Sequence, residues 1–249
     1  MGLNRLVAFG VIALTLGYAG AAKADGFSNG QFVTQDEGNW GAGGVAASLL
    51  TANYDSVYAS TDDVLIVGVV GTPGQYFMAF SGASAVAAYI PANGAPEALS
   101  ASLSNPTNSP SGLFGGDVVA LTLNVDISNA GFLRGTSSIP FGNLDLTNFS
   151  GGLSGLNGLT VSQFLGIANT CLGDGSCPCG SDNVAAIADE LDASFDDGSA
   201  SKFADSNLAL PGSTTPAPEP SSLWLLVPAL AGLALLRRRS LRSYRTRSS

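Results

Sequence analysis

The chain has 249 residues, enough for one domain of ordinary size, with 19 acidic residues, 10 basic residues and no histidine. Between residues 25 and 217 only Arg134 and Lys202 are basic, whereas 18 acidic residues lie there, so this span has a net charge of −16. Nucleic acid binding needs clustered Lys and Arg to neutralise phosphates, and this composition excludes it. The lack of histidine removes the Ser-His and Cys-His nucleophile pairs and the commonest metal ligand, which argues against an enzyme.

Residues 1–24 have the three parts of a secretory signal peptide. Arg5 supplies a short positive region, an apolar stretch runs from Leu6 to Ala19, and Ala22-Lys23-Ala24 has the small-x-small pattern of a cleavage site. The alternative is a buried N-terminal helix, but the apolar run has no polar face. The sequence therefore predicts export through the secretion machinery, with cleavage between Ala24 and Asp25.

Residues 25–205 are expected to form a globular domain outside the cytoplasm, of the α+β class and mainly helical with a short β-hairpin. Apolar residues at helical spacing predict a helix near 43–58. Apolar runs at 64–70 and 75–80 flank a Gly-Thr-Pro-Gly turn and predict the hairpin. Further helices are expected over 84–90, which stops at a proline, and over 96–103, which a proline opens.

The second half of the span begins with a segment that fits two periods. Within residues 113–127 the apolar side chains alternate with polar ones as in a strand, and apolar side chains also recur at helical spacing. The length of the segment favours a helix, and either structure would place it in the core. An amphipathic helix is predicted over 160–172, with Thr160 near its start. Asp182 opens another helix, expected to stop at Gly198.

Five stretches of this span resemble a recurrent extracellular bacterial domain of unknown function. The resemblance covers most of residues 27–203, and it implies a single folded domain with no particular chemistry. The stretches are Asn39-Trp40-Gly41-Ala42-Gly43-Gly44, Ser84-Ala85-Val86-Ala87-Ala88-Tyr89-Ile90-Pro91, Asn105-Pro106-Thr107, Leu121-Thr122-Leu123-Asn124-Val125-Asp126 and Asn157-Gly158-Leu159-Thr160-Val161.

Three cysteines, Cys171, Cys177 and Cys179, lie within nine residues in a loop after a helix. In an oxidising compartment one local disulfide is expected. Cys171 reaches Cys177 or Cys179 more easily than those two reach each other, so the pairing stays open between these alternatives. A metal or redox site is the competing hypothesis, but structural zinc usually takes four ligands and only three sulfurs are present. The sequence predicts neither a metal site nor a cofactor.

Two other groups of residues have a structural and a functional interpretation. Acidic residues could gather calcium, but their spacing does not match an EF-hand loop, and a solvated acidic face is the main expectation. Aromatic residues could stack on sugar rings, but core packing is the main expectation. The acidic residues are Asp62, Asp63, Asp189, Glu190, Asp192, Asp196 and Asp197; the aromatic ones are Phe32, Trp40, Tyr54 and Tyr58.

The C-terminal part divides into a Ser/Thr/Pro linker over 206–217 and a tail over 218–249. The tail contains Pro218-Glu219-Pro220, an apolar segment of 14 residues over 223–236, and Arg237-Arg238-Arg239. As a helix this segment would span roughly 21 Å, which is short against a hydrocarbon core of about 30 Å. The arginines would hold the tail end in the cytoplasm, leaving residues 25–220 outside the inner membrane. An ordinary tail anchor is the alternative.

These features resemble the PEP-CTERM sorting domain, with Pro218, Glu219 and Pro220 as its sorting motif. The resemblance implies processing by an exosortase, a membrane-embedded transpeptidase-like protease of Gram-negative bacteria that often make exopolysaccharide. The sequence therefore predicts a non-catalytic exported protein that passes transiently through the inner membrane to the cell envelope or extracellular matrix, with exopolysaccharide as a further partner. The alternative is a carbohydrate-binding module or a weak polysaccharide-acting enzyme delivered by the same tail.

Overall fold

The computed structural model describes residues 26–41 and 43–213; the signal peptide, its cleavage site and the sorting tail lie outside them. The helices and strands follow one another in an α+β arrangement dominated by helices, as predicted. In chain order they are α1 (Glu37–Gly41), α2 (Val45–Tyr58), η1 (Ala59–Thr61), β1 (Leu65–Gly68), β2 (Phe77–Phe80), α3 (Ala83–Tyr89), β3 (Leu103–Ser104), α4 (Gly112–Asn129), η2 (Phe141–Asn143), β4 (Asp145–Leu146), η3 (Gly151–Leu156), α5 (Val161–Asp174), α6 (Ser181–Asp192), α7 (Lys202–Asn207) and β5 (Leu208–Ala209).

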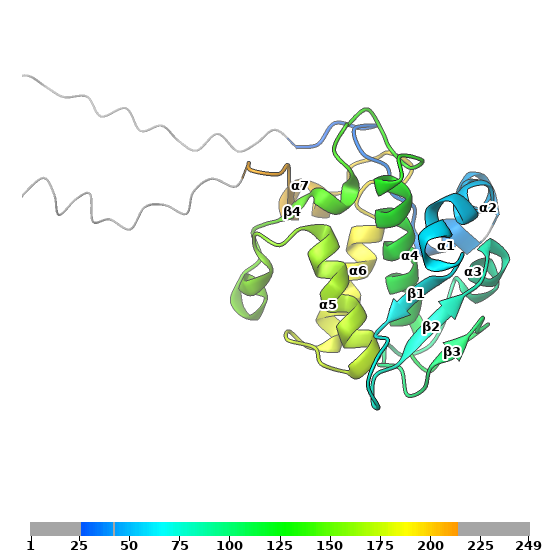
Figure 1. The fold of residues 1–249 in the computed structure, drawn as a ribbon. Coiled ribbons are helices and arrows are strands. Elements are labelled where there is room, and N and C mark those ends of the chain that lie inside the picture. Colours follow the sequence, from blue (N-terminus) through cyan, green and yellow to red (C-terminus); the bar gives the residue numbers. More distant parts are fainter. Residues whose placement is uncertain (1–25, 42, 214–249) are drawn as a thin grey trace, which may run out of the picture.

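Helix α4 runs through the middle of the domain (Figure 1). Helices α5 and α6 pack on one side of it, and α1, α2 and β1 contact it from the other. Every residue from Phe114 to Val125 is buried. A helix enclosed on all sides needs no polar face, so its sequence carries no clear helical period. This is why residues 113–127 also fit the pattern of a strand; the expectation of a core helix is confirmed.

The predicted hairpin is confirmed as the antiparallel pair β1–β2. Leu65 pairs with Phe80 and Val67 with Met78, and all four side chains are buried, whereas Ile66 between them is exposed. This alternation places one face of the sheet against the helices. The short strand β3 adds to the other edge of β2 in parallel.

The helix predicted over 96–103 is wrong. The amide of Glu97 donates to the Ser111 carbonyl, the amide of Leu99 donates to the Leu172 carbonyl, and β3 begins at Leu103. Leu99 is buried between these partners. Bonds to distant carbonyls pair these backbone amides, so the segment forms no helix despite a favourable helix start.

The last part of the domain differs from the prediction in its boundaries. Helix α5 begins after Thr160 as expected, with a capping box between Thr160 and Gln163. Helix α6 ends at Asp192, before the predicted stop at Gly198. The folded chain also continues past residue 205, because β5 pairs with β4. Any linker therefore begins later than the predicted residue 206.

Helix α5 packs so closely on the hairpin that Gly173 has no room for a side chain. A Cβ there would clash with backbone atoms of Val69 and Tyr76, and the Tyr76 amide donates to the Gly173 carbonyl, which joins the two elements. We expect Gly173→Ala to lower the free energy of unfolding by roughly 1–3 kcal/mol, because overpacking outweighs the helix propensity of alanine. Urea denaturation followed by circular dichroism measures this change.

Gly166 on the exposed face of the same helix is the matched control. An added Cβ meets nothing within 4 Å there. Gly166→Ala should therefore raise the free energy of unfolding by about 0.5–1 kcal/mol. Equal effects of the two substitutions would contradict the close packing of α5 on the hairpin.

Candidate functional site

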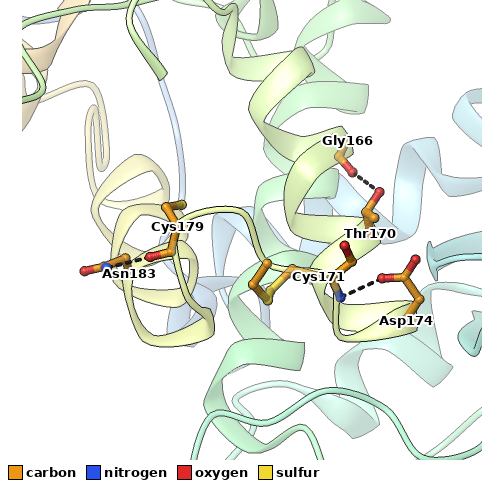
Figure 2. Close-up of a disulfide and its surroundings, with 8 residues drawn as sticks. Gly166, Thr170, Cys171, Asp174, Cys179 and Asn183 are labelled. Carbon is orange, nitrogen blue, oxygen red and sulfur yellow. Dashed lines mark hydrogen bonds between the residues drawn. A yellow bond between two sulfur atoms is a disulfide. The ribbon is translucent and has the colours of Figure 1, made fainter. Parts of the chain in front are cut away.

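Cys171 lies in the last turn of α5, and the structure joins it to Cys177 in the following loop, with their Cα atoms 4.7 Å apart. This is one of the two pairings that the sequence left open. Cys179 lies apart from the disulfide, next to the start of α6 (Figure 2). Partial burial raises the pKa of its thiol. A raised pKa keeps the sulfur protonated at neutral pH, so Cys179 is poorly suited to act as a nucleophile.

The acidic residues do not all form a solvated face. Asp62, Asp63, Asp189, Glu190 and Asp197 are exposed and Asp196 is half-buried. Asp192, however, is only 2% exposed, so the expectation of a solvated face is wrong for this residue. The signal was present in the sequence: Asp192 follows Ala188 by four residues and lies in the apolar stripe of α6.

Asn124 of α4 connects Asp192 to the N-terminal segment in the core. Its amide nitrogen donates to the Gln35 carbonyl at 2.8 Å and to Oδ1 of Asp192 at 3.0 Å, and its oxygen accepts from the Gln35 amide at 2.9 Å. Thr34 adds a bond from its hydroxyl to the Asp192 carbonyl at 2.6 Å. The network satisfies polar groups of three separate segments where water is excluded.

Carboxyl groups next to this network carry strongly shifted pKa values. Burial, with the charges of Glu37 and Asp189, raises the pKa of Asp117 to about 8. Burial also raises the pKa of Asp192 well above its usual value, against the lowering effect of Asn124. The second oxygen of Asp192, Oδ2, has no hydrogen-bond partner. Asp117 is therefore mainly protonated at neutral pH, and burial favours the neutral form of Asp192 as well.

No cluster within residues 26–41 and 43–213 has three or more Cys, Asp or Glu side chains placed to hold a metal ion. The metal hypothesis raised by the acidic residues gains no support from this part of the chain.

The four aromatic residues that could stack on sugar rings lie in the core. Phe32, Trp40, Tyr54 and Tyr58 are at most 5% exposed. The Tyr54 hydroxyl donates to the Phe80 carbonyl and accepts from the Leu65 amide, which ties α2 to both hairpin strands. These rings stabilise the fold and offer no exposed face to a sugar.

A pocket of about 450 Å³ lies where the C-terminal ends of α2 and α4 meet the start of β1. The last turn of α2, with η1, forms one wall, and Asp126, Asn129 and Ala130 of α4 form another. Val64 and Ile66 close the third side. Sequence reasoning missed this site because its walls come from distant segments.

Asp126 and Tyr58 are the ionisable side chains of the pocket. Burial raises the pKa of Asp126 to about 6, although the adjacent Tyr58 hydroxyl lowers it. Burial also raises the pKa of Tyr58 well above its usual value, and the charge of Asp126 raises it further. The Tyr58 hydroxyl is buried yet completes no hydrogen bond of normal geometry. The pocket therefore presents a carboxylate that is mainly ionised at neutral pH, next to a buried hydroxyl without a hydrogen-bond partner.

No protein-family model, curated protein or solved structure matches the chain. Within the part of the chain that the structure describes, none of the helices combines the length and apolar character needed to cross a bilayer. We take the pocket between α2 and α4 as the candidate site because of its geometry and its buried carboxylate.

The raised pKa of Asp117 predicts a fold that loses stability as pH rises. An unfolded Asp, with a pKa near 3.8, loses its proton before the folded Asp117, whose pKa is about 8. The stabilisation from protonated Asp117 is therefore complete below about pH 4 and is lost as pH rises to about 8. The Tm of the purified protein should fall by several degrees between about pH 5 and pH 8.

Asp117→Asn should flatten this pH dependence, because an amide fits the same space without titrating. The exposed Asp182, at the start of α6, gives the control variant Asp182→Asn, which should keep the wild-type slope. A Tm that is constant or rises over this range in the wild type would refute the buried neutral carboxyls.

Asn124→Ala should be strongly destabilising, because it leaves both backbone groups of Gln35 and one oxygen of Asp192 without their partner in a buried position. We expect a loss of roughly 3–5 kcal/mol in the free energy of unfolding, measured by urea denaturation. Asn93→Ala, at an exposed position with one long bond to the Pro91 carbonyl, should change it by less than about 0.5 kcal/mol. Similar losses for both variants would contradict the role of Asn124.

Proposed function

We propose that this chain is an exported, non-catalytic protein of the cell envelope or extracellular matrix, delivered by a PEP-CTERM tail. The observation that carries the proposal is the order of segments in the sequence. A signal-peptide pattern precedes the folded domain, and Pro218-Glu219-Pro220, an apolar segment and three arginines follow it. This order suits a protein that crosses the inner membrane, is held there by its tail, and is then released by a membrane protease.

The disulfide between Cys171 and Cys177 supports export. Structural disulfides persist in oxidising compartments and are rare in the cytosol. The high net charge of the domain would keep the exported protein soluble.

The non-catalytic part of the proposal is supported by chemistry. The chain has no histidine, which is the usual general base. The strongly shifted carboxyls Asp117 and Asp192 are almost fully buried in the core, where a substrate could not reach them. The competing carbohydrate-binding hypothesis loses its main argument, because the aromatic residues on which it depended are buried as well.

The intact mass of the protein from an exosortase-producing bacterium tests this proposal. The mature chain should begin at Asp25 and end near Pro218–Pro220. In a strain without the protease, the tail should persist through Ser249. A tail that persists in both strains would show a simple membrane anchor and overturn the sorting proposal.

Replacing Pro218, Glu219 and Pro220 by alanine should retain the tail even when the protease is present. Replacing Pro211, Pro216 and Glu97 by alanine is the control, because it removes the same residue types outside the motif. Processing that survives the first replacement would show that the motif is not what the protease recognises.

A further inference from the structure

The pocket between α2 and α4 lies in a field that favours a positive charge. One wall is the last turn of α2, and the C-terminal end of a helix carries a partial negative charge. Asp126 adds a carboxylate at the last turn of α4. The surrounding domain has an excess of acidic residues, which raises the local concentration of cations further.

Nothing in the described part of the chain neutralises Asp126. The shift in its pKa comes from burial and from Tyr58, with no contribution from a cation. Arg134, the basic residue nearest in sequence, donates instead to the backbone carbonyls of Ser128 at 2.9 Å and Asn129 at 3.1 Å. The guanidinium thus covers the end of α4 and leaves the carboxylate to the pocket.

The size and lining of the pocket indicate which cation fits. A divalent metal takes six or more oxygen ligands, usually from several carboxylates, but a single carboxylate lines this pocket. An ammonium group needs one negative charge and up to three acceptors, which Asp126 and the hydroxyls of Ser56, Ser60 and Thr61 can supply.

The remaining wall is apolar. Val57, Val64 and Ile66 line it, and Ile66 is 42% exposed although it is a large apolar residue in a strand. An alkyl chain attached to the ammonium group would cover these side chains, as the stem of a lysine covers apolar surface elsewhere.

We propose that this pocket binds a primary alkylammonium group, carried either by a small aliphatic amine or by a lysine side chain. The ammonium group lies against the Asp126 carboxylate, and the alkyl stem packs on Val57, Val64 and Ile66. The buried Tyr58 hydroxyl lies next to this carboxylate.

Isothermal titration calorimetry on the full-length protein tests this proposal with n-pentylamine, and 1-pentanol serves as a neutral ligand with the same stem. We expect pentylamine to bind and pentanol not to bind. Asp126→Asn should weaken pentylamine binding by about tenfold or more, since a hydrogen-bonded charge pair is lost. Glu190→Gln removes the same charge from an exposed position outside the pocket and should leave the affinity within about twofold.

Ile66→Ala tests the apolar wall at an exposed position whose change leaves the core intact. It should weaken pentylamine binding about threefold and leave methylamine, which lacks the stem, unaffected. Nα-acetyl-lysine methylamide distinguishes the two sources: tighter binding than pentylamine indicates a lysine side chain, and weaker binding indicates a small amine. Equal binding of pentylamine and pentanol, or an unchanged affinity in Asp126→Asn, would overturn the proposal. Circular dichroism shows whether each variant is folded.

Discussion

The burial of α4 from Phe114 to Val125 is the constraint on which the rest of the structure depends. A helix through the middle of a small domain must satisfy every polar side chain that it carries, because water cannot do so. Asn124 binds the segment at Gln35, and the Ser128 hydroxyl accepts from the Phe141 amide. Thr122 bonds back to its own helix at the Val118 carbonyl. The hydrogen bonds of this one helix therefore fix the positions of segments that are distant in sequence.

The charge composition explains how the core treats its carboxyl groups. A buried carboxylate is usually paired with Lys or Arg, but residues 25–217 contain only Arg134 and Lys202, and Arg134 is bound to backbone carbonyls. Burial therefore favours the neutral form of both Asp117 and Asp192. Replacing a salt bridge by a proton avoids the desolvation of two charges, and it makes stability depend on pH.

Local periodicity predicted much of this fold, and tertiary contacts account for what it missed. The hairpin and the helices α2, α3 and α5 follow from the spacing of apolar residues. The sequence of residues 96–103 also favours a helix, but bonds from the Glu97 and Leu99 amides to distant carbonyls replace the helical ones. The pocket had no local signal at all, because Tyr58 and Asp126 meet only in the folded chain. The sorting motif had a strong signal, but it lies outside the described residues.

Asp126 is the residue that the fold itself explains least well. It is largely buried, which disfavours a carboxylate. Serine or asparagine would line the same wall without this cost. Residues that violate local preferences without a structural gain concentrate at functional positions. A bound ammonium group would relieve this cost, because it would pair with the carboxylate. The Asp126 carboxylate thus lowers the stability of the empty domain, and it would strengthen binding when an ammonium group occupies the pocket.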